Sequence, residues 1–437
     1  MNESSQQLAI RGGTPVREKP FPAHITIGEE EKAAVSRVLG SGVLSGYLGC
    51  WHEQFYGGVE VRALEEEWAA YFGARHAIAV NSCTSGLYAA VGATGIEPGE
   101  EVIVTPYSMS ASATAPLVYQ GIPVFADIEE DCFCLDPASV EACITPRTRA
   151  ILVVDLFGLP YDAAAINALA EKHGLTVIED VAQAPGAKWN DRFAGTLADV
   201  GVFSLNYHKH IHCGEGGVVV TDDDELAGKI RLIRNHAEAV VEGHGFESLV
   251  NMVGFNYRMT EIEASIARCQ LEKLEGLLES RIANCRYLEE RLAVIPALRP
   301  PKVRSSCTHV YYQHVYRFDE VEAGVSRNRY IEAVKSELPC FDKRENEGVK
   351  LNVGYVKPLY LQPLFQQQIA FGSEGRPFSD PNVAEVPDYE EGRCPVAERL
   401  YARELVLHEF MLPCMTRDDL DDVVRAFEKV WSLRDSL

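Results

Sequence analysis

Lys209 stands in a polar loop between two apolar runs, five residues after Ser204 and five before Gly214. Residues 200–205 and 217–221 each have the length and composition of a short buried strand. A lysine amine forms a Schiff base with a carbonyl when burial or nearby cations lower its pKa. An isolated loop lysine is usually solvated, so the chemistry of Lys209 depends on which groups the fold brings to it.

A stretch of small polar residues follows the apolar run 77–80 and opens a helical pattern at residue 82. A helix N-terminus with free N–H groups and hydroxyls binds anions, and phosphate is the usual one. The same stretch is also an ordinary helix cap. The candidate anion ligands are Cys83, Thr84 and Ser85.

Asp180 follows the apolar run 175–179, and Gln183 comes one turn later. A carboxylate at a strand end can cap a helix. Opposite a lysine that carries a pyridoxal aldehyde, the carboxylate can have a catalytic role. A pyridoxal ring acts as an electron sink when its nitrogen stays protonated, and a nearby carboxylate keeps it so. Gln183 is placed to hydrogen-bond the phenolic oxygen of such a ring.

A polar turn over residues 254–261 precedes a long amphipathic helical pattern, and its alternative interpretation is again a helix cap. Ligands of open α/β sheets bind at the carboxyl ends of the strands. Each of these features alone has an ordinary structural explanation. An anion site, a carboxylate and a lysine in that order at strand ends together indicate a site for pyridoxal 5′-phosphate.

The pattern between residues 77 and 221 predicts an α/β fold with a mostly parallel sheet, because short apolar runs alternate with helical segments. A helix is expected over 29–39, ending at Gly40, and Leu64, Trp68 and Phe72 recur at helical spacing as core residues. Seven runs are predicted strands: 77–80, 102–105, 123–126, 150–155, 175–179, 200–205 and 217–221.

Three parts are expected in a chain of 437 residues, which is too long for one compact core. They are an N-terminal arm (1–30), a large cofactor-binding domain (31–275) and a small α/β domain (276–437). The small domain is expected to contain a strand over 310–318, a helix over 327–336, a loop-rich stretch over 341–395 and a final helix near 417–435.

The composition is that of a soluble globular protein, with 46% hydrophobic and 24% charged residues. A net charge of −23 argues against nucleic acid or an anionic membrane as a partner, since both need a basic face. Twelve scattered cysteines without a Cys-x-x-Cys, and a start without a signal-peptide pattern, predict reduced thiols in a cytoplasmic protein. No Gly-x-Gly-x-x-Gly follows a predicted strand, which disfavours a nicotinamide enzyme.

The chain resembles the fold-type I pyridoxal-phosphate enzymes, and among them the DegT/StrS sugar and aminocyclitol aminotransferases. The similarity runs from Gly12-Gly13-Thr14-Pro15-Val16-Arg17 to the C-terminal helix. Its strongest motif is Phe203-Ser204 with Lys209 and Gly214-Glu215-Gly216-Gly217 at the family's spacing. The resemblance implies a three-layer fold with a seven-stranded sheet.

The resemblance also assigns roles to the site residues. It implies that Lys209 is the Schiff-base lysine and that Ser204 and Thr84 bind the phosphate. Asp180 then meets the pyridine nitrogen, Gln183 meets the ring oxygen, and Asn256 reaches the phosphate of the other subunit's cofactor, so that a homodimer shares its active sites.

Met109 stands where the family usually has an aromatic residue stacked on the cofactor ring, and a methionine sulfur can also pack on a ring face. Cys83 stands where glycine is common, and its thiol is expected to be a bystander. His208, His210 and His212 are unusual: some of them are expected to line the phosphate or substrate pocket, while a metal site on one strand face is the alternative.

The expected function is a ping-pong aminotransferase that moves an amino group from glutamate or glutamine to a keto-sugar or keto-cyclitol, as in sugar, aminocyclitol or antibiotic biosynthesis. Tyr257, Arg258 and His236 are the candidate substrate contacts, together with the aromatic loop 47–58. The alternatives are a pyridoxal-phosphate dehydratase or lyase that acts on a sugar, and a non-catalytic regulatory homologue. Retention of the lysine favours amino transfer.

Overall fold

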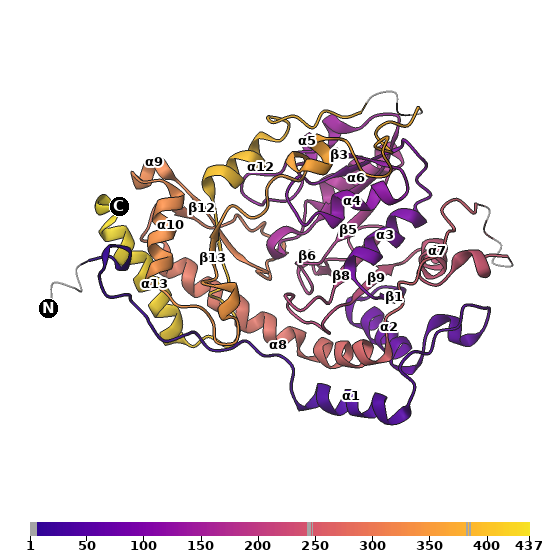
Figure 1. The fold of residues 1–437 in the computed structure, drawn as a ribbon, viewed down its shortest axis with the longest axis horizontal. Helices are drawn as coiled ribbons and strands as arrows, with labels where there is room; N and C mark the ends of the chain where they lie inside the picture. Colours follow the sequence, from indigo (N-terminus) through magenta and orange to yellow (C-terminus); the bar gives the residue numbers. More distant parts are fainter. Residues whose placement is uncertain (1–6, 243–245, 247, 382, 384–385) are drawn as a thin grey trace.

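The computed structural model describes residues 7–437 except 243–245, 247, 382 and 384–385. Two lobes lie side by side and are joined along one edge by a long helix, α8 (Figure 1). In the described part of the chain, none of the helices combines the length and the apolar character that crossing a membrane requires.

The larger lobe is built on a seven-stranded sheet with the order β1-β9-β8-β5-β4-β2-β3. Only β9 runs against its neighbours, and the other six strands run in one direction. All seven predicted strands are therefore confirmed, and the sheet is mostly parallel. The strands are β1 (His76–Val80), β2 (Glu101–Val104), β3 (Ile122–Phe125), β4 (Thr148–Val154), β5 (Thr176–Asp180), β8 (Val200–Ser204) and β9 (Gly217–Thr221).

Helices cover both faces of this sheet, because alternate side chains of a strand point to opposite faces. Ile78 and Val202 belong to the same core cluster as residues of α3 to α7, whereas Ala77 and Phe203 pack in a cluster with α2 and α8. This arrangement gives the three predicted layers. The helices are α2 (Val59–Phe72), α3 (Cys83–Ala93), α4 (Ala111–Val118), α5 (Pro137–Cys143), α6 (Ala163–His173) and α7 (Asp224–Arg234).

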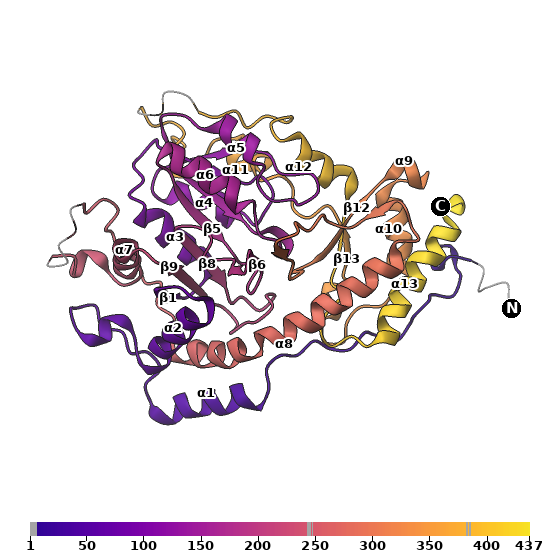
Figure 2. The same ribbon diagram turned by 180° about the vertical axis from the view of Figure 1, so that it is seen from behind.

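Helix α8 (Glu261–Leu292) starts beside α2 and ends under the smaller lobe, as both views show (Figures 1 and 2). Thr260 and Glu263 form a capping box at its start. Leu271, Leu274 and Leu278 face the large-lobe cluster, whereas Cys285 and Leu288 belong to the small-lobe cluster. The predicted boundary at residue 275 falls inside this helix, and the division into domains stays a prediction.

The smaller lobe contains a four-stranded antiparallel sheet with the order β10-β12-β14-β13. Its elements are β10 (Leu298–Arg299), β12 (His314–Phe318), α9 (Glu320–Ala323), α10 (Arg327–Ser336), β13 (Leu351–Val353), α11 (Pro363–Gln366), α12 (Pro395–Arg399), β14 (Leu405–His408) and α13 (Arg417–Ser432). A separate three-stranded sheet, β11-β6-β7, joins Cys307–Thr308 to Lys188–Trp189 and Arg192–Phe193.

The N-terminal arm, described from residue 7, runs along the small lobe before α1 (Glu29–Ser41) begins beside α8 (Figure 1). Leu8 and Phe21 are fully buried in the small-lobe core. The arm therefore packs against the small lobe, which lies almost three hundred residues later in the chain.

Two predicted boundaries differ from the structure. Helix α1 continues past Gly40 to Ser41, because Gly42 at φ 71° supplies its left-handed cap. The strand expected over 310–318 begins only at His314, because Tyr311 has φ 49° and the amides of Val310 and Tyr312 bond instead to the carbonyls of Gly158 and Phe157.

Candidate active site

The Lys209 loop leaves the end of β8 and folds back on itself before β9 begins. The Leu205 amide bonds to the Gly216 carbonyl at 2.9 Å, and the Tyr207 amide bonds to the Gly214 carbonyl at 2.9 Å. Gly214 has φ 92°, a conformation that favours glycine. The Lys209 amide also donates to the Asn206 carbonyl at 2.9 Å, so the backbone that carries the lysine is held in place.

The Lys209 amine lies over the ring of Tyr312, with Nζ 4.3 Å from the ring centroid. It forms no ion pair with any residue that the structure describes. Tyr312 is placed by the Phe157 carbonyl, which accepts a hydrogen bond from its amide at 2.7 Å. The lysine is only partly buried, and a cation–π contact takes the place of a carboxylate partner.

Asp180 ends β5 and is 4% exposed. Its carboxylate accepts hydrogen bonds from the Ser112 hydroxyl at 2.9 Å and the Ala182 amide at 3.0 Å, and the Cys83 thiol is 3.9 Å away. Burial raises the pKa of Asp180 above its ordinary value, while these bonds and the charge of Lys209 act in the opposite direction. The carboxylate forms no ion pair within the described chain, so it can accept a cationic N–H from a ligand.

Gln183 follows Asp180 by one turn and is 2% exposed. Its Oε1 accepts a bond from the Phe157 amide at 2.8 Å, and its Nε2 donates to the Tyr355 hydroxyl at 3.1 Å. The first bond fixes which way the amide faces. Burial raises the pKa of the Tyr355 phenol to about 12, so this hydroxyl stays protonated at neutral pH.

The N-terminus of α3 lies against the start of β9. Ser82 caps the helix, with its Oγ accepting a bond from the Ser85 amide at 3.0 Å. A Cβ on Gly217 would lie 2.7 Å from the Cys83 amide nitrogen, so only glycine permits this approach. Gly217 pairs with Ser204, which brings the predicted phosphate ligand Ser204 beside the helix terminus.

The hydroxyl of Thr84 makes no hydrogen bond to any residue in the described part of the chain, which leaves it available to an anion. The first amides of a helix have no partner within that helix. Burial and the nearby Asp180 raise the pKa of the Cys83 thiol well above its ordinary value, so this sulfur is a protonated neighbour and not a nucleophile.

The other predicted contacts lie around the rim of the site. Asn256 is exposed, and its side-chain oxygen accepts a bond from Arg258 at 2.8 Å. The Tyr257 carbonyl accepts the Asn81 amide at 2.8 Å, next to the α3 terminus, and His236 lies near Gly49 of the aromatic loop. No contact joins Tyr257, Arg258 or His236 to Lys209 among the described residues.

Met109 is 63% exposed and precedes α4, the helix that carries Ser112. It stands three residues before Ser112, whose hydroxyl bonds to Asp180, and its own side chain is not buried. Whether it covers a cofactor ring, as the resemblance implies, stays a prediction.

The three histidines of the loop do not share a strand face. His210 is buried and bonds to the Val310 carbonyl at 3.0 Å, whereas His212 bonds to the Thr26 hydroxyl at 3.1 Å and His208 is exposed. In the described residues, no cluster of three or more potential metal ligands is present. The loop contains no strand, so the described residues lack the strand face on which the alternative of a metal site depends.

A cavity of about 320 Å³, the Lys209 cavity, opens beside the lysine. Its walls come from the N-terminal arm, the Lys209 loop, α8 and the small lobe, and they include His208 and His212. That this cavity is the substrate pocket stays a prediction. The sequence prediction missed Tyr312 and Arg281 in these walls. It also missed Ser112 and Tyr355, which hold Asp180 and Gln183. Only Ser112 had a signal, because it follows the predicted strand 102–105.

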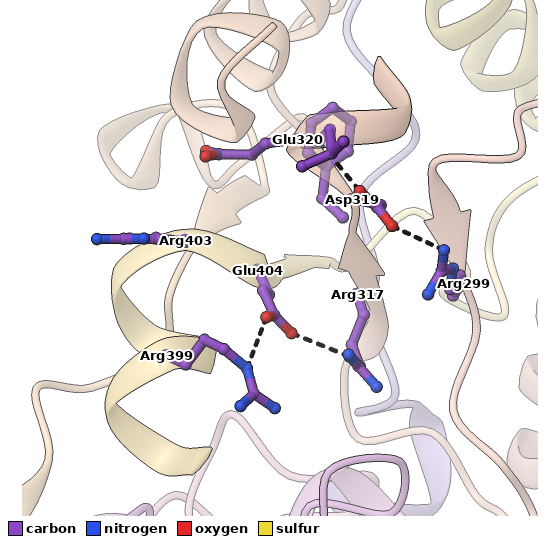
Figure 3. Close-up of a pocket in the computed structure, with 9 residues that line it drawn as sticks. Arg299, Arg317, Asp319, Glu320, Arg399, Arg403 and Glu404 are labelled. Carbon is purple, nitrogen blue, oxygen red and sulfur yellow. Dashed lines mark hydrogen bonds and ion pairs between the residues drawn. The ribbon is translucent and has the colours of Figure 1, made fainter. Parts of the chain in front are cut away.

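A second cavity, of about 240 Å³, lies in the small lobe and contains none of the predicted site residues (Figure 3). Its arginines are mostly paired: Glu404 accepts from Arg317 at 3.1 Å and from Arg399 at 2.7 Å, and Arg299 is 2.7 Å from Asp319. These ion pairs join α12, β10 and β12, and they stabilise the lobe without forming a reactive centre.

Comparisons with known proteins identify the family of this chain. The model of the DegT/DnrJ/EryC1/StrS aminotransferase family matches residues 26–428. The spore coat polysaccharide biosynthesis protein SpsC of Bacillus subtilis (strain 168) is 34% identical over 92% of this chain and 95% of its own. An L-glutamine:2-deoxy-scyllo-inosose aminotransferase of Streptomyces lividus is 32% identical over 98% of each chain.

The X-ray crystal structure of DesV from S. venezuelae in complex with a ketimine intermediate superposes with a TM-score of 0.74. It is 31% identical and covers 92% of this chain and 94% of its own. The fold and site thus define a fold-type I pyridoxal-phosphate transferase. The chain belongs to the DegT/DnrJ/EryC1/StrS aminotransferase family and is a pyridoxal-phosphate-dependent sugar or cyclitol aminotransferase.

The residues present fit this cofactor. A buried carboxylate without a cation partner, a lysine amine without an ion pair and a helix terminus at a glycine cradle are three separate complements to pyridoxal phosphate.

Proposed function

We propose that this enzyme transfers the amino group of glutamine or glutamate to the ketone of a cyclitol or sugar, in two half-reactions at one site. The observation that carries the proposal is the lysine amine on the Tyr312 ring, free of a carboxylate and near the buried Asp180. The name of the Streptomyces lividus relative, a glutamine-dependent cyclitol aminotransferase, supports this donor and this ketone.

Pyridoxal phosphate supplies the carbonyl that takes up the amine and the ring that accepts electron density. In this proposal Lys209 Nζ holds the aldehyde in the resting enzyme and, once released, carries a proton between the two carbons that exchange the amino group. The ring of Tyr312 orients the amine without neutralising it, as a carboxylate would.

Asp180 keeps a negative charge at the ring nitrogen, and Ser112 and the Ala182 amide stabilise that charge. Gln183 presents an N–H of Nε2 to the ring oxygen; the same nitrogen also donates to the Tyr355 hydroxyl, and the Phe157 amide holds Oε1 on the other side. Ser204, Thr84 and the first amides of α3 bind the phosphate. These roles follow from the resemblance, and the geometry described above supports them.

The shared site of a homodimer is part of the proposal. Asn256 is exposed and its side chain faces Arg258, so it is free to meet a second subunit. Several large apolar side chains near the rim are also exposed, among them Val43, Leu44 and Leu48. Such a surface is typical of a protein–protein contact.

Absorbance spectra of the purified holoenzyme test the function. Addition of glutamine or glutamate is expected to convert the absorbance of the lysine-bound cofactor to that of the aminated cofactor, and Lys209→Ala is expected to abolish both this conversion and turnover. Turnover by Lys209→Ala contradicts the assigned role of the lysine. If neither donor changes the spectrum, and product analysis finds a dehydrated sugar, the enzyme is a lyase.

A further inference from the structure

Arg281 is a buried arginine in the wall of the Lys209 cavity that has no carboxylate partner. Its side chain comes from α8 and is 5% exposed. Nη1 donates to the carbonyls of Tyr311 and Tyr312 at 3.0 and 3.3 Å. The other nitrogens make no hydrogen bond, and the group forms no ion pair, with the residues that the structure describes. Buried charges are normally paired, so this one lacks a partner that a ligand can supply.

The contacts of Tyr312 connect Arg281 to the reactive lysine. Its backbone carbonyl accepts from the Arg281 guanidinium, and its ring lies under Lys209 Nζ. The two cations therefore flank one residue and face the same cavity. A molecule in this cavity that reacts at Lys209 therefore lies in a space that Arg281 also lines.

The residues that line the cavity with Arg281 carry more positive than negative charge. Arg344 is matched by Glu409 at 2.8 Å and by Glu347 at 2.7 Å, but Lys343 has no partner for its amine in the described chain. Burial, followed by the charges of Arg281 and Arg344, lowers the pKa of His24 to about 4. Burial opposes a charge of either sign, but the contribution of the two arginines to this shift favours an anion over a cation.

From these contacts we infer that the Lys209 cavity binds the carboxylate of the amino-acid donor, with Arg281 as its main ligand and Lys343 as a second cation. The inference rests on the proposed aminotransferase function and adds to it the residues that recognise the donor. A guanidinium offers a planar pair of N–H groups that matches a carboxylate. A keto-cyclitol, the ketone that the name of the Streptomyces lividus relative supports, is uncharged and needs no such group.

Calorimetric titration of the holoenzyme with two unreactive ligands tests the inference. Glutaric acid monoamide has the carboxylate and carboxamide of glutamine without the amine, and glutaramide is its uncharged counterpart. The monoamide is expected to bind at least about tenfold more tightly, the worth of one charged hydrogen bond. Equal affinities for the two ligands overturn the inference, whatever the variants do.

Arg281→Lys is expected to weaken monoamide binding about tenfold or more and to raise the glutamine concentration needed for half conversion. Arg327→Lys is the matched control, because Arg327 is also buried and bonds to backbone carbonyls, those of Leu400 and Ala402 among them, outside this cavity. A folded Arg281→Lys with wild-type affinity overturns the inference.

Lys343→Ala removes an exposed side chain, so it is a safe variant if Arg281→Lys does not fold. It is expected to weaken monoamide binding about two- to fivefold, while Lys302→Ala, an exposed lysine elsewhere, has no effect. Unchanged affinity in Lys343→Ala then counts against the inference. If no donor converts the cofactor but the monoamide still binds more tightly, the proposed function fails and the carboxylate site stands.

Discussion

Ser112→Ala is expected to shift the acid limit of activity to higher pH. Ser112 Oγ donates to Asp180 at 2.9 Å, and the Ala182 amide is the only other donor at normal hydrogen-bond length within the described residues. Removing the hydroxyl leaves the carboxylate with half of its good donors. Because these bonds stabilise the charged form, their loss raises the pKa of Asp180 beyond the increase that burial already causes.

The size of this shift follows from the bond that is lost. A hydrogen bond to a charged group contributes about 1.5–3 kcal/mol, and one pKa unit corresponds to about 1.4 kcal/mol. The pKa of Asp180 in the variant therefore rises by about one to two units. A cofactor ring nitrogen bound at Asp180, as proposed, would share the carboxylate charge, so the lower end of this range, about one unit, is expected.

The assay is kcat/KM measured against pH for wild type and variant at full cofactor occupancy, since this ratio reports groups of the free enzyme. The acid limb is expected to move upward in Ser112→Ala. Ser265→Ala is the control, because Ser265 is also a buried serine but bonds only to the Ile262 carbonyl in α8. An acid limb that stays in place, or that moves equally in the control, refutes the reasoning.

Two further variants test buried residues next to the proposed cofactor ligands. Tyr355→Phe leaves the Gln183 amide without its acceptor, so kcat is expected to fall about two- to tenfold; unchanged steady-state kinetics show that Tyr355 does not position Gln183. Glu179 is fully buried beside Asp155, and burial raises its pKa to about 7. The folded state thus binds more protons than the unfolded one between about pH 4.5 and 7, so wild-type stability falls as the pH rises through that window. Glu179→Gln is expected to flatten this fall in urea unfolding, by up to about 3 kcal/mol at pH 8, and an unchanged slope contradicts it.

The fold could be predicted because its signals are local and repeated. The seven runs of buried strand residues are continuous and β-branched, and each lies between clear turns. The long helix α8 shows its apolar stripe and its capping box in the sequence. Element boundaries were missed where backbone conformation depends on tertiary contacts, as at Tyr311, whose φ of 49° delays β12.

In the candidate site, too, the residues at strand ends could be predicted from the sequence, and the residues brought in by long-range packing could not. Asp180 and Ser204 are the last residues of β5 and β8, and Lys209 lies in the loop after β8. Because strand ends meet at one edge of a parallel sheet, their proximity follows from topology. Tyr312 and Arg281 reach the site through long-range packing: the amides of Val310 and Tyr312 bond to the Gly158 and Phe157 carbonyls, and Phe157 itself has φ 59°.

Nothing near Tyr312 in the sequence signals this connection. The proposed cofactor ligands are thus placed by the ends of the sheet strands, whereas Tyr312 and Arg281, which line the Lys209 cavity, are placed by the packing of the two lobes. Substrate choice can therefore change with the small lobe and α8 while the cofactor site stays the same. The proposed carboxylate ligand Arg281 is consistent with this division, because it lies on α8, the element that the two lobes share.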